Sequence, residues 1–118
     1  MRVLLHPAED ELRLENVLHA LSDPARLEVV RTLMALGTEQ SCSALGEAMA
    51  KSTLSHHLKV LRESGITRTR MTGTHRFVMI RADELNRLFP GLLNLVERSG
   101  PPALTDKAVA ALAARNAA

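Results

Sequence analysis

The sequence predicts a mostly helical domain that carries one small β-hairpin. Apolar residues recur at three- and four-residue steps over most of the chain, which is the period of an amphipathic helix. Between residues 66 and 81 the pattern changes to two short β-branched or aromatic runs around a Thr-Gly-Thr turn, which is typical of a hairpin. The length of 118 residues, with 46% hydrophobic and 24% charged residues, is that of one globular domain.

The first two expected helices have clear start and stop signals. One covers residues 9–21, with acidic residues in its first turn, where the helix dipole favours them. The second begins after Asp23, a typical N-cap, with Pro24 at the first helical position. Gly37 predicts the end of this helix, because glycine readily adopts the left-handed conformation there. A short polar connection over residues 38–41 follows.

Two shorter helices are expected at residues 43–49 and 52–63, joined by a tight turn. The hairpin follows, with strands at residues 66–71 and 75–81 and Gly73 in the turn. Four helices followed by a two-stranded ribbon are the element order of a winged helix-turn-helix domain.

The helical period returns after the hairpin, over residues 83–88, and Pro90 kinks or breaks this helix before the apolar stripe continues. A Ser-Gly-Pro-Pro linker comes next. We therefore expect the winged helix-turn-helix domain to cover residues 1–100, followed by an Ala-rich tail over residues 101–118. Two outcomes are open for the tail, a last helix or a frayed end.

The composition disfavours several classes of function. Only two residues are aromatic, which argues against sugar platforms and base-stacking grooves for single strands. Polar residues interrupt every apolar run, so we expect no bilayer-spanning segment and no membrane partner. One cysteine allows no internal disulfide, which fits a cytoplasmic protein. The chain has no catalytic nucleophile–base set, phosphate-binding glycine loop or zinc-binding helix motif. We expect no enzyme, no cofactor and no metal.

The charge is distributed unevenly along the chain. Residues 51–81 carry seven Lys and Arg side chains against Glu63 alone, a net charge of +6, whereas the rest of the chain has −4. A basic segment inside an otherwise acidic domain is typical of a protein that binds a polyanion such as DNA. A solvated Arg-rich face is the alternative, which charge alone does not exclude.

The expected helix over residues 52–63 has two different faces. Leu54, Leu58 and Leu61 lie on one side, bordered by His57, for which we expect a structural role. The opposite face carries hydroxyl, imidazole and ammonium groups, which hydrogen-bond base edges and phosphates. An ordinary amphipathic surface helix is the alternative, but such helices are rich in Glu, which this face lacks. The expected DNA-contacting residues of this segment are Lys51, Ser52, Thr53, Ser55, His56, Lys59 and Arg62.

Three arginines of the expected hairpin, Arg68, Arg70 and Arg76, flank the Gly73 turn. Arginine at the tip of a β-ribbon is suited to binding phosphates or entering the minor groove. The alternative is an edge strand protected by charge. That alternative explains one or two arginines better than three, so all three are expected DNA contacts.

Two segments together resemble the ArsR/SmtB family of bacterial repressors. One is Leu21-Ser22-Asp23-Pro24-Ala25-Arg26-Leu27, and the other, residues 52–66, contains Ser55-His56-His57-Leu58-Lys59-Val60-Leu61. The hairpin segment over residues 70–77 also looks like that family's wing, and the match covers about residues 12–97. The resemblance implies repression relieved by an inducer, with a pseudo-palindromic operator in double-stranded DNA and a second copy of the chain as partners.

The resemblance also implies where two copies meet, namely residues 9–21 and 83–98. The apolar residues of these segments are the expected dimer interface: Leu14, Val17, Leu18, Leu85, Leu88, Leu92, Leu93 and Val96.

The chain departs from this family at the sensor sites. Metal-sensing members carry a Cys-x-Cys group where this chain has Ser41-Cys42-Ser43, and no histidine follows His75 to supply a zinc site after the wing. Cys42 is therefore the one candidate sensing residue. A position near a helix N-terminus is expected to lower the pKa of its thiol and favour the reactive thiolate. The alternative is a buried cysteine without reactivity.

The sequence thus predicts a sequence-specific DNA-binding repressor of ArsR type. A signal releases it from its operator, and oxidation or modification of Cys42 is one candidate for that signal. The alternatives are a repressor with a non-thiol inducer and a winged-helix module that binds proteins instead of DNA.

Overall fold

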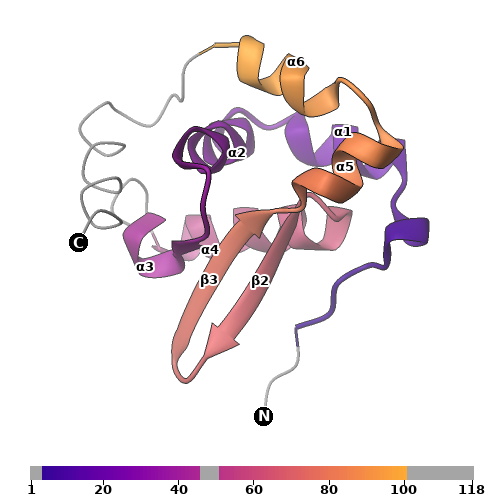
Figure 1. The fold of residues 1–118 in the computed structure, drawn as a ribbon. Helices are drawn as coiled ribbons and strands as arrows, with labels where there is room; N and C mark the ends of the chain where they lie inside the picture. The colour runs from indigo at the N-terminus through magenta and orange to yellow at the C-terminus, as the bar shows by residue number, and fades with distance from the viewer. Residues whose placement is uncertain (1–3, 46–50, 101–118) are drawn as a thin grey trace.

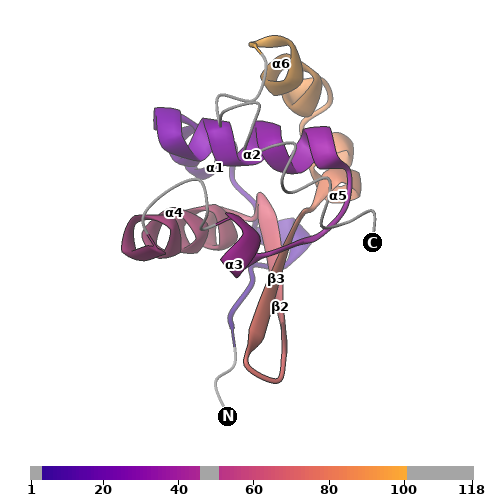
Figure 2. The same cartoon turned by 90° about the vertical axis from the view of Figure 1, so that its left-hand side faces the viewer.

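The computed structural model describes residues 4–45 and 51–100. The fold is mostly helical, with a small antiparallel sheet whose hairpin extends away from the helices (Figures 1 and 2). It is compatible with the predicted winged helix-turn-helix domain. The elements are a 3-10 turn Glu9–Glu11, α1 Leu14–Leu21, α2 Pro24–Leu36, β1 Gln40–Ser41, α3 Cys42–Leu45, α4 Lys51–Ser64, β2 Thr67–Thr72, β3 His75–Ile80, α5 Ala82–Leu88 and α6 Leu92–Arg98.

Both end signals predicted for α2 are confirmed. The Oδ1 atom of Asp23 accepts hydrogen bonds from the backbone N–H groups of Ala25 at 2.8 Å and Arg26 at 3.2 Å. Gly37 adopts the left-handed conformation with φ of 67° after the last turn. These local contacts satisfy backbone groups that the helix itself leaves unpaired.

The single helix predicted over residues 9–21 is wrong in its first half. The chain makes a 3-10 turn, passes through Leu12 and Arg13 in extended conformation, and only then enters α1. The side chain of Leu12 is 7% exposed and covers Gly65, where a Cβ atom would lie 1.9 Å from Leu12 Cδ2. Burial of Leu12 in the core therefore accompanies the interruption of the helix.

The sheet contains a strand that the sequence did not predict. Its order is β1-β3-β2, and Gln40 and Ser41 pair with Val78 and Phe77 of β3. The expectation of a polar connection over residues 38–41 is therefore wrong at these two residues, because a two-residue strand has no periodicity of its own. The hairpin prediction is confirmed, and Gly73 provides a positive φ of 61° in the turn.

Other predicted boundaries shift by one or two residues. The helix predicted over residues 43–49 begins at Cys42, and its second half, from residue 46, lies outside the described residues. The break expected at Pro90 is observed between α5 and α6. The tail over residues 101–118 also lies outside the described residues.

The core is aliphatic and lies where α1, α2, α4, the sheet and the last two helices meet. Its fully buried members come from every one of these layers, among them Val17, Val30, Leu61, Val78 and Leu85. This core supports α4 and the hairpin on the same body. Within the described ranges, no helix is both long and apolar enough to span a membrane.

Candidate nucleic-acid interface

The two faces of α4 are distributed as the sequence predicts. Leu54, Leu58 and Leu61 are buried, and His57 beside them is 8% exposed. The opposite side of the helix is exposed to solvent. The side chains of Lys51 and Ser52 are outside the part that the structure describes. The exposed polar residues of this face, here called the α4 face, are Thr53, Ser55, His56 and Lys59.

A buried arginine holds α4 against the rest of the domain. Arg26 Nε donates a hydrogen bond of 2.7 Å to the carbonyl oxygen of Ala20, at the end of α1. Its Nη1 atom lies 3.4 Å from Nδ1 of His57 on α4. Because a guanidinium only donates, Nδ1 of His57 is the acceptor in this contact. Arg26 thus connects α1, α2 and α4 and orients the α4 face.

The carboxylate of Asp23 stabilises the segment from which Arg26 projects. The hydrogen bond from the Arg26 backbone N–H is the largest cause that lowers the pKa of Asp23, and the bond from Ala25 adds to it. Both bonds favour the ionised carboxylate. The cap therefore keeps its charge, and the first turn of α2 keeps its geometry, under neutral conditions.

The three arginines of the hairpin do not lie together at its tip. Arg68 and Arg70 project from the outer face of the sheet, and Arg68 pairs with Met79, far from the turn. Arg76 is on the opposite face, toward α3 and α4. The three arginines therefore do not form one basic tip. Arg76 pairs with Met71, the neighbour of Arg70, and neighbouring residues of a strand point to opposite faces.

Both outer arginines of the wing form ion pairs with carboxylates. Arg68 Nη2 lies 3.0 Å from Glu84 Oε1 on α5, and Arg70 Nη2 lies 2.6 Å from Glu39 Oε1. The Arg70 guanidinium also stacks over the Phe77 ring at 4.5 Å from its centroid. Hydrogen bonding to Glu39 raises the pKa of Arg70 further above its ordinary value. These contacts attach the wing to the body of the domain.

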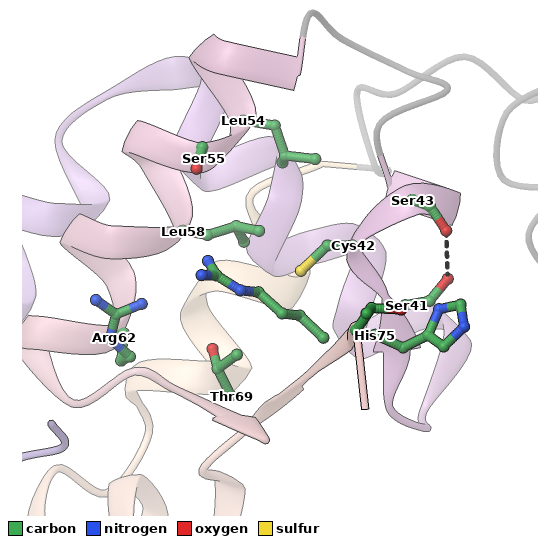
Figure 3. A pocket seen from close by; sticks show the side chains of 11 residues that line it. Ser41, Cys42, Ser43, Leu54, Ser55, Leu58, Arg62, Thr69 and His75 are labelled. Atoms are coloured by element: carbon green, nitrogen blue, oxygen red, sulfur yellow. Dashed lines mark hydrogen bonds between the residues drawn. The ribbon is translucent and has the colours of Figure 1, made fainter. Parts of the chain in front are cut away.

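A cavity of about 550 Å³ lies between α3, α4 and the wing, and we call it the wing cavity (Figure 3). It brings together four residues named from the sequence: Ser55 and Arg62 of α4, Arg76 of β3 and Cys42 of α3. Its wall thus includes Ser55 of the α4 face. The complete set of lining residues is Ser41, Cys42, Ser43, Leu54, Ser55, Leu58, Arg62, Thr69, Thr74, His75 and Arg76.

Cys42 is half-buried, and its sulfur points toward the interior of the wing cavity (Figure 3). Burial raises the pKa of the Cys42 thiol, and the nearby positive charge of Arg76 offsets this only in part. The expected lowering of this pKa is therefore wrong, since desolvation outweighs the favourable charges. At neutral pH the thiol form dominates.

The expected dimer residues divide into two groups. Val17, Leu85, Leu93 and Val96 are buried in the core of the single chain, and Leu92 is partly buried against it. Exposed large apolar residues, by contrast, form an unpartnered set on α1, α5 and α6. The exposed fractions are 45% for Leu14, 50% for Leu18, 38% for Leu88 and 67% for Leu95.

Sequence reasoning missed the groups that pair with the basic segment. Glu39 and Glu84 hold the wing arginines, and His6 Nε2 accepts a hydrogen bond of 3.0 Å from the backbone N–H of Thr69. Each partner lies at least sixteen residues away along the chain. Only Leu95 had a local signal, since it continues the helical spacing of Leu88 and Leu92. In the described part of the chain, no group of three His, Cys, Asp or Glu residues is arranged to hold a metal ion.

The sequence of the chain is similar to those of known helix-turn-helix regulators. Residues 21–70, from the end of α1 to the wing, match the family described as "Helix-turn-helix domain". An uncharacterized HTH-type transcriptional regulator of Bacillus subtilis, YceK, is 40% identical over 88 residues, which are 73% of this chain and 87% of the relative. The arsenical resistance operon repressor of Staphylococcus xylosus is 32% identical over 74 residues, covering 62% of this chain and 70% of that protein.

An uncharacterized HTH-type transcriptional regulator of Methanocaldococcus jannaschii, MJ1325, is also 32% identical over 74 residues. The match covers 62% of this chain and 83% of that protein. The segment that matches the helix-turn-helix family, residues 21–70, includes the Asp23 cap, Arg26 and α4.

Proposed function

The chain belongs to the ArsR-type family of helix-turn-helix transcriptional regulators, and on this basis we propose that it represses transcription as a homodimer bound to operator DNA. It is a DNA-binding transcriptional regulator. The observation that carries the proposal is the α4 face, whose exposed side chains are hydroxyls, an imidazole and an ammonium, with no carboxylate before Glu63 in the last turn of the helix. Such a face is suited to the major groove.

The α4 residues have different roles in this proposal. Ser55 and His56 read base edges, while Lys59 binds a phosphate of the backbone. Arg62 and Arg76, on the two sides of the wing cavity, add positive charge where the DNA backbone passes between α4 and the wing. Lys51, Ser52 and Thr53 complete the contacts at the N-terminal end of the helix.

Homodimerisation is supported by the exposed leucines of α1, α5 and α6. Leu14, Leu18, Leu88 and Leu95 are large apolar side chains exposed to solvent, and burying them between two copies is favourable. A two-fold dimer presents two copies of α4, so its operator is a pseudo-palindrome with half-sites a whole number of helical turns apart. Its place of action is the cytoplasm, where the operator is accessible.

The DNA contacts are tested by fluorescence anisotropy with the promoter region upstream of the chain's own gene. Ser55→Ala or His56→Ala should cost about 1–3 kcal/mol of binding free energy at particular base pairs and little at others. Lys59→Ala should weaken binding to all sequences and reduce the salt slope by about 1. Asn94→Ala, an exposed change on α6, is the control. Affinity that does not depend on salt would instead favour a protein-binding module.

The dimer is tested by sedimentation together with DNA binding. Leu18→Glu places a charge on the exposed stripe of α1 without touching the core, since this side chain is half exposed. It should produce monomers and remove operator binding. A monomeric parent protein that still binds its operator tightly would contradict the proposal.

The releasing signal has two candidates. The raised pKa of Cys42 leaves little thiolate at neutral pH, which favours a non-thiol inducer over a thiol switch. Cys42→Ser separates them. If the Cys42→Ser variant still leaves DNA on treatment with peroxide or a quinone, the thiol switch is excluded. If the variant no longer responds, the result supports the thiol switch.

A further inference from the structure

The wing cavity has the size of a small-molecule site. Its volume of about 550 Å³ lies within the range of roughly 300–1,000 Å³ that is typical of ligand pockets. Three separate segments form it, α3, α4 and the hairpin, so its shape exists only in the folded domain (Figure 3).

The charge of the wing cavity is positive. Arg62 and Arg76 contribute guanidinium groups, and none of the lining residues is Asp or Glu. The four ion pairs in the described part of the chain occupy Arg68, Arg70, Arg81 and Arg87 instead. Arg62 and Arg76 are in none of these pairs, so no carboxylate of the pairs neutralises the charge of either one. Such a cavity attracts an anion.

Two buried polar atoms at the cavity have no hydrogen-bond partner among the described residues. They are Oγ1 of Thr69 and Nε of Arg62. Thr69 is only 6% exposed, and its hydroxyl oxygen is turned toward the cavity interior (Figure 3). A buried donor without a partner costs free energy, and both groups can donate. An oxyanion supplies the acceptors that both lack.

Part of the remaining wall of the wing cavity is apolar, although the hydroxyls of Ser41, Ser43, Ser55 and Thr74 also line it. Leu54 and Leu58 of α4 lie on one side and the sulfur of Cys42 on the other, while the His75 ring points away from the centre (Figure 3). A ligand that fills this space has an apolar body as well as an acidic group. A phosphodiester of duplex DNA carries the same anionic chemistry, but its body is polar sugar.

We propose that the wing cavity binds a small organic carboxylate with a compact apolar body, and that this ligand displaces the operator. Arg76 and Arg62 bind the carboxylate, Thr69 donates a hydrogen bond to it, and Leu54 and Leu58 cover the apolar part. Because Ser55 belongs to both the cavity wall and the α4 face, an occupied cavity changes the DNA-reading surface. This consequence rests on the proposed function, whereas binding to the cavity does not.

Binding is tested first without DNA, with benzoate as the probe and amide NMR as the readout. Benzoate should bind saturably and shift the amides of β2 and α4, and the uncharged benzamide should bind at least about tenfold more weakly, the value of a charged hydrogen bond. Arg76→Gln should weaken benzoate binding by about the same factor. Absence of saturable benzoate binding, or equal binding of benzamide, overturns the proposal.

Two threonines of β2 provide a matched pair of variants. Thr69→Val removes the hydroxyl that faces the cavity and should weaken benzoate binding about two- to tenfold. Thr67→Val removes a hydroxyl that is equally buried and unpartnered, on the same face of the strand but outside the cavity lining, and should leave binding unchanged. Equal effects of the two variants overturn the assignment of the site.

The effect on DNA is measured separately, by anisotropy with and without benzoate. Benzoate should lower the operator affinity of the parent protein several-fold, and less so that of Thr69→Val. If the Thr69→Val substitution lowers DNA affinity in the absence of benzoate, the cavity holds a DNA phosphate. The proposal that it binds a free ligand is then overturned. If the protein binds benzoate but does not bind DNA even without benzoate, the proposed function is contradicted, whereas the proposed ligand site is supported.

Discussion

The recognition helix α4 and the wing are both basic in sequence, yet they are attached to the domain differently. The helix is attached through its buried side, and the wing through its exposed outer face. The buried side of α4 is anchored through His57 and Arg26, so its polar face is left exposed. The wing is attached through its outer face, where Arg68 and Arg70 bind Glu84 and Glu39. The polar face of α4 is exposed, whereas two of the three wing arginines are already bound to carboxylates of the domain.

The difference shows that a count of cations does not identify a DNA-binding surface. An exposed ion pair is worth only about 0–1 kcal/mol, so the wing arginines can exchange a carboxylate for a phosphate at small cost. The buried bonds of Arg26 are different, because their loss leaves polar groups unsatisfied inside the protein. We therefore expect the α4 anchor to determine stability and the wing pairs to adjust affinity.

Breaking the anchor should have the largest effect. Arg26→Ala removes the hydrogen bond to the Ala20 carbonyl and the contact to His57, and we expect the free energy of unfolding to fall by about 2–4 kcal/mol. Urea unfolding measures it. Arg98→Ala, at the exposed end of α6, is the control and should change stability by less than about 0.5 kcal/mol. Equal effects of the two variants would show that the anchor is dispensable.

Glycine substitutions compare the end of α4 with the tip of the wing. Gly65 and Gly73 both have positive φ, but a Cβ atom at Gly65 would lie 1.9 Å from Leu12 Cδ2, whereas Gly73 faces open space. Gly65→Ala should destabilise the fold by about 2–4 kcal/mol, through the overpacking added to backbone strain. Gly73→Ala should cost about 1 kcal/mol, from strain alone. Thermal or urea unfolding that finds the two equal would contradict this packing.

Releasing a wing arginine from its ion pair should have a smaller effect, and it should strengthen DNA binding instead of destabilising the fold. Glu39→Gln removes the partner of Arg70, and we expect operator affinity to rise about two- to fivefold because the freed guanidinium can bind a phosphate. Anisotropy titrations over a range of salt concentrations measure it. Glu97→Gln makes the same change of charge on exposed α6 and is the control. Weaker binding by Glu39→Gln would mean that the ion pair positions the wing for DNA.

The smallest expected effect concerns pH. Burial, and then the charges of Arg62, Arg68 and Arg81, lower the pKa of His6 below its ordinary 6.5. The unfolded chain therefore takes up the proton more readily, so the His6 contribution to stability is complete above pH 6.5 and is lost as the pH falls through the lower, folded value.

Protonation also removes the acceptor for the Thr69 backbone N–H. The check is urea unfolding above and below pH 6.5, where His6→Gln should show a shallower loss of stability on acidification than the parent. His19→Gln, at an exposed position of α1, should behave like the parent. If all three proteins lose stability in parallel, His6 does not contribute.

Much of the fold follows from local signals in the chain. The Asp23 cap, the Gly37 stop, the Gly73 turn and the apolar stripe of α4 depend on residues within a few positions of each other, and the structure confirms each of them. The exposure of Ser55 and its neighbours follows from the same periodicity. These features are readable because helix and turn energetics act over three or four residues.

The tertiary structure alone decided which polar groups are paired and which are free. The strand at Gln40, the interruption at Leu12, the pairs of Glu39 and Glu84 and the separation of Arg76 from Arg70 all depend on contacts between distant segments or on strand facing. Burial also reversed the expected pKa of Cys42. The sequence by itself determined the α4 face and the family, since these are local patterns. The wing cavity and its uncompensated charge exist only once α3, α4 and the hairpin pack together.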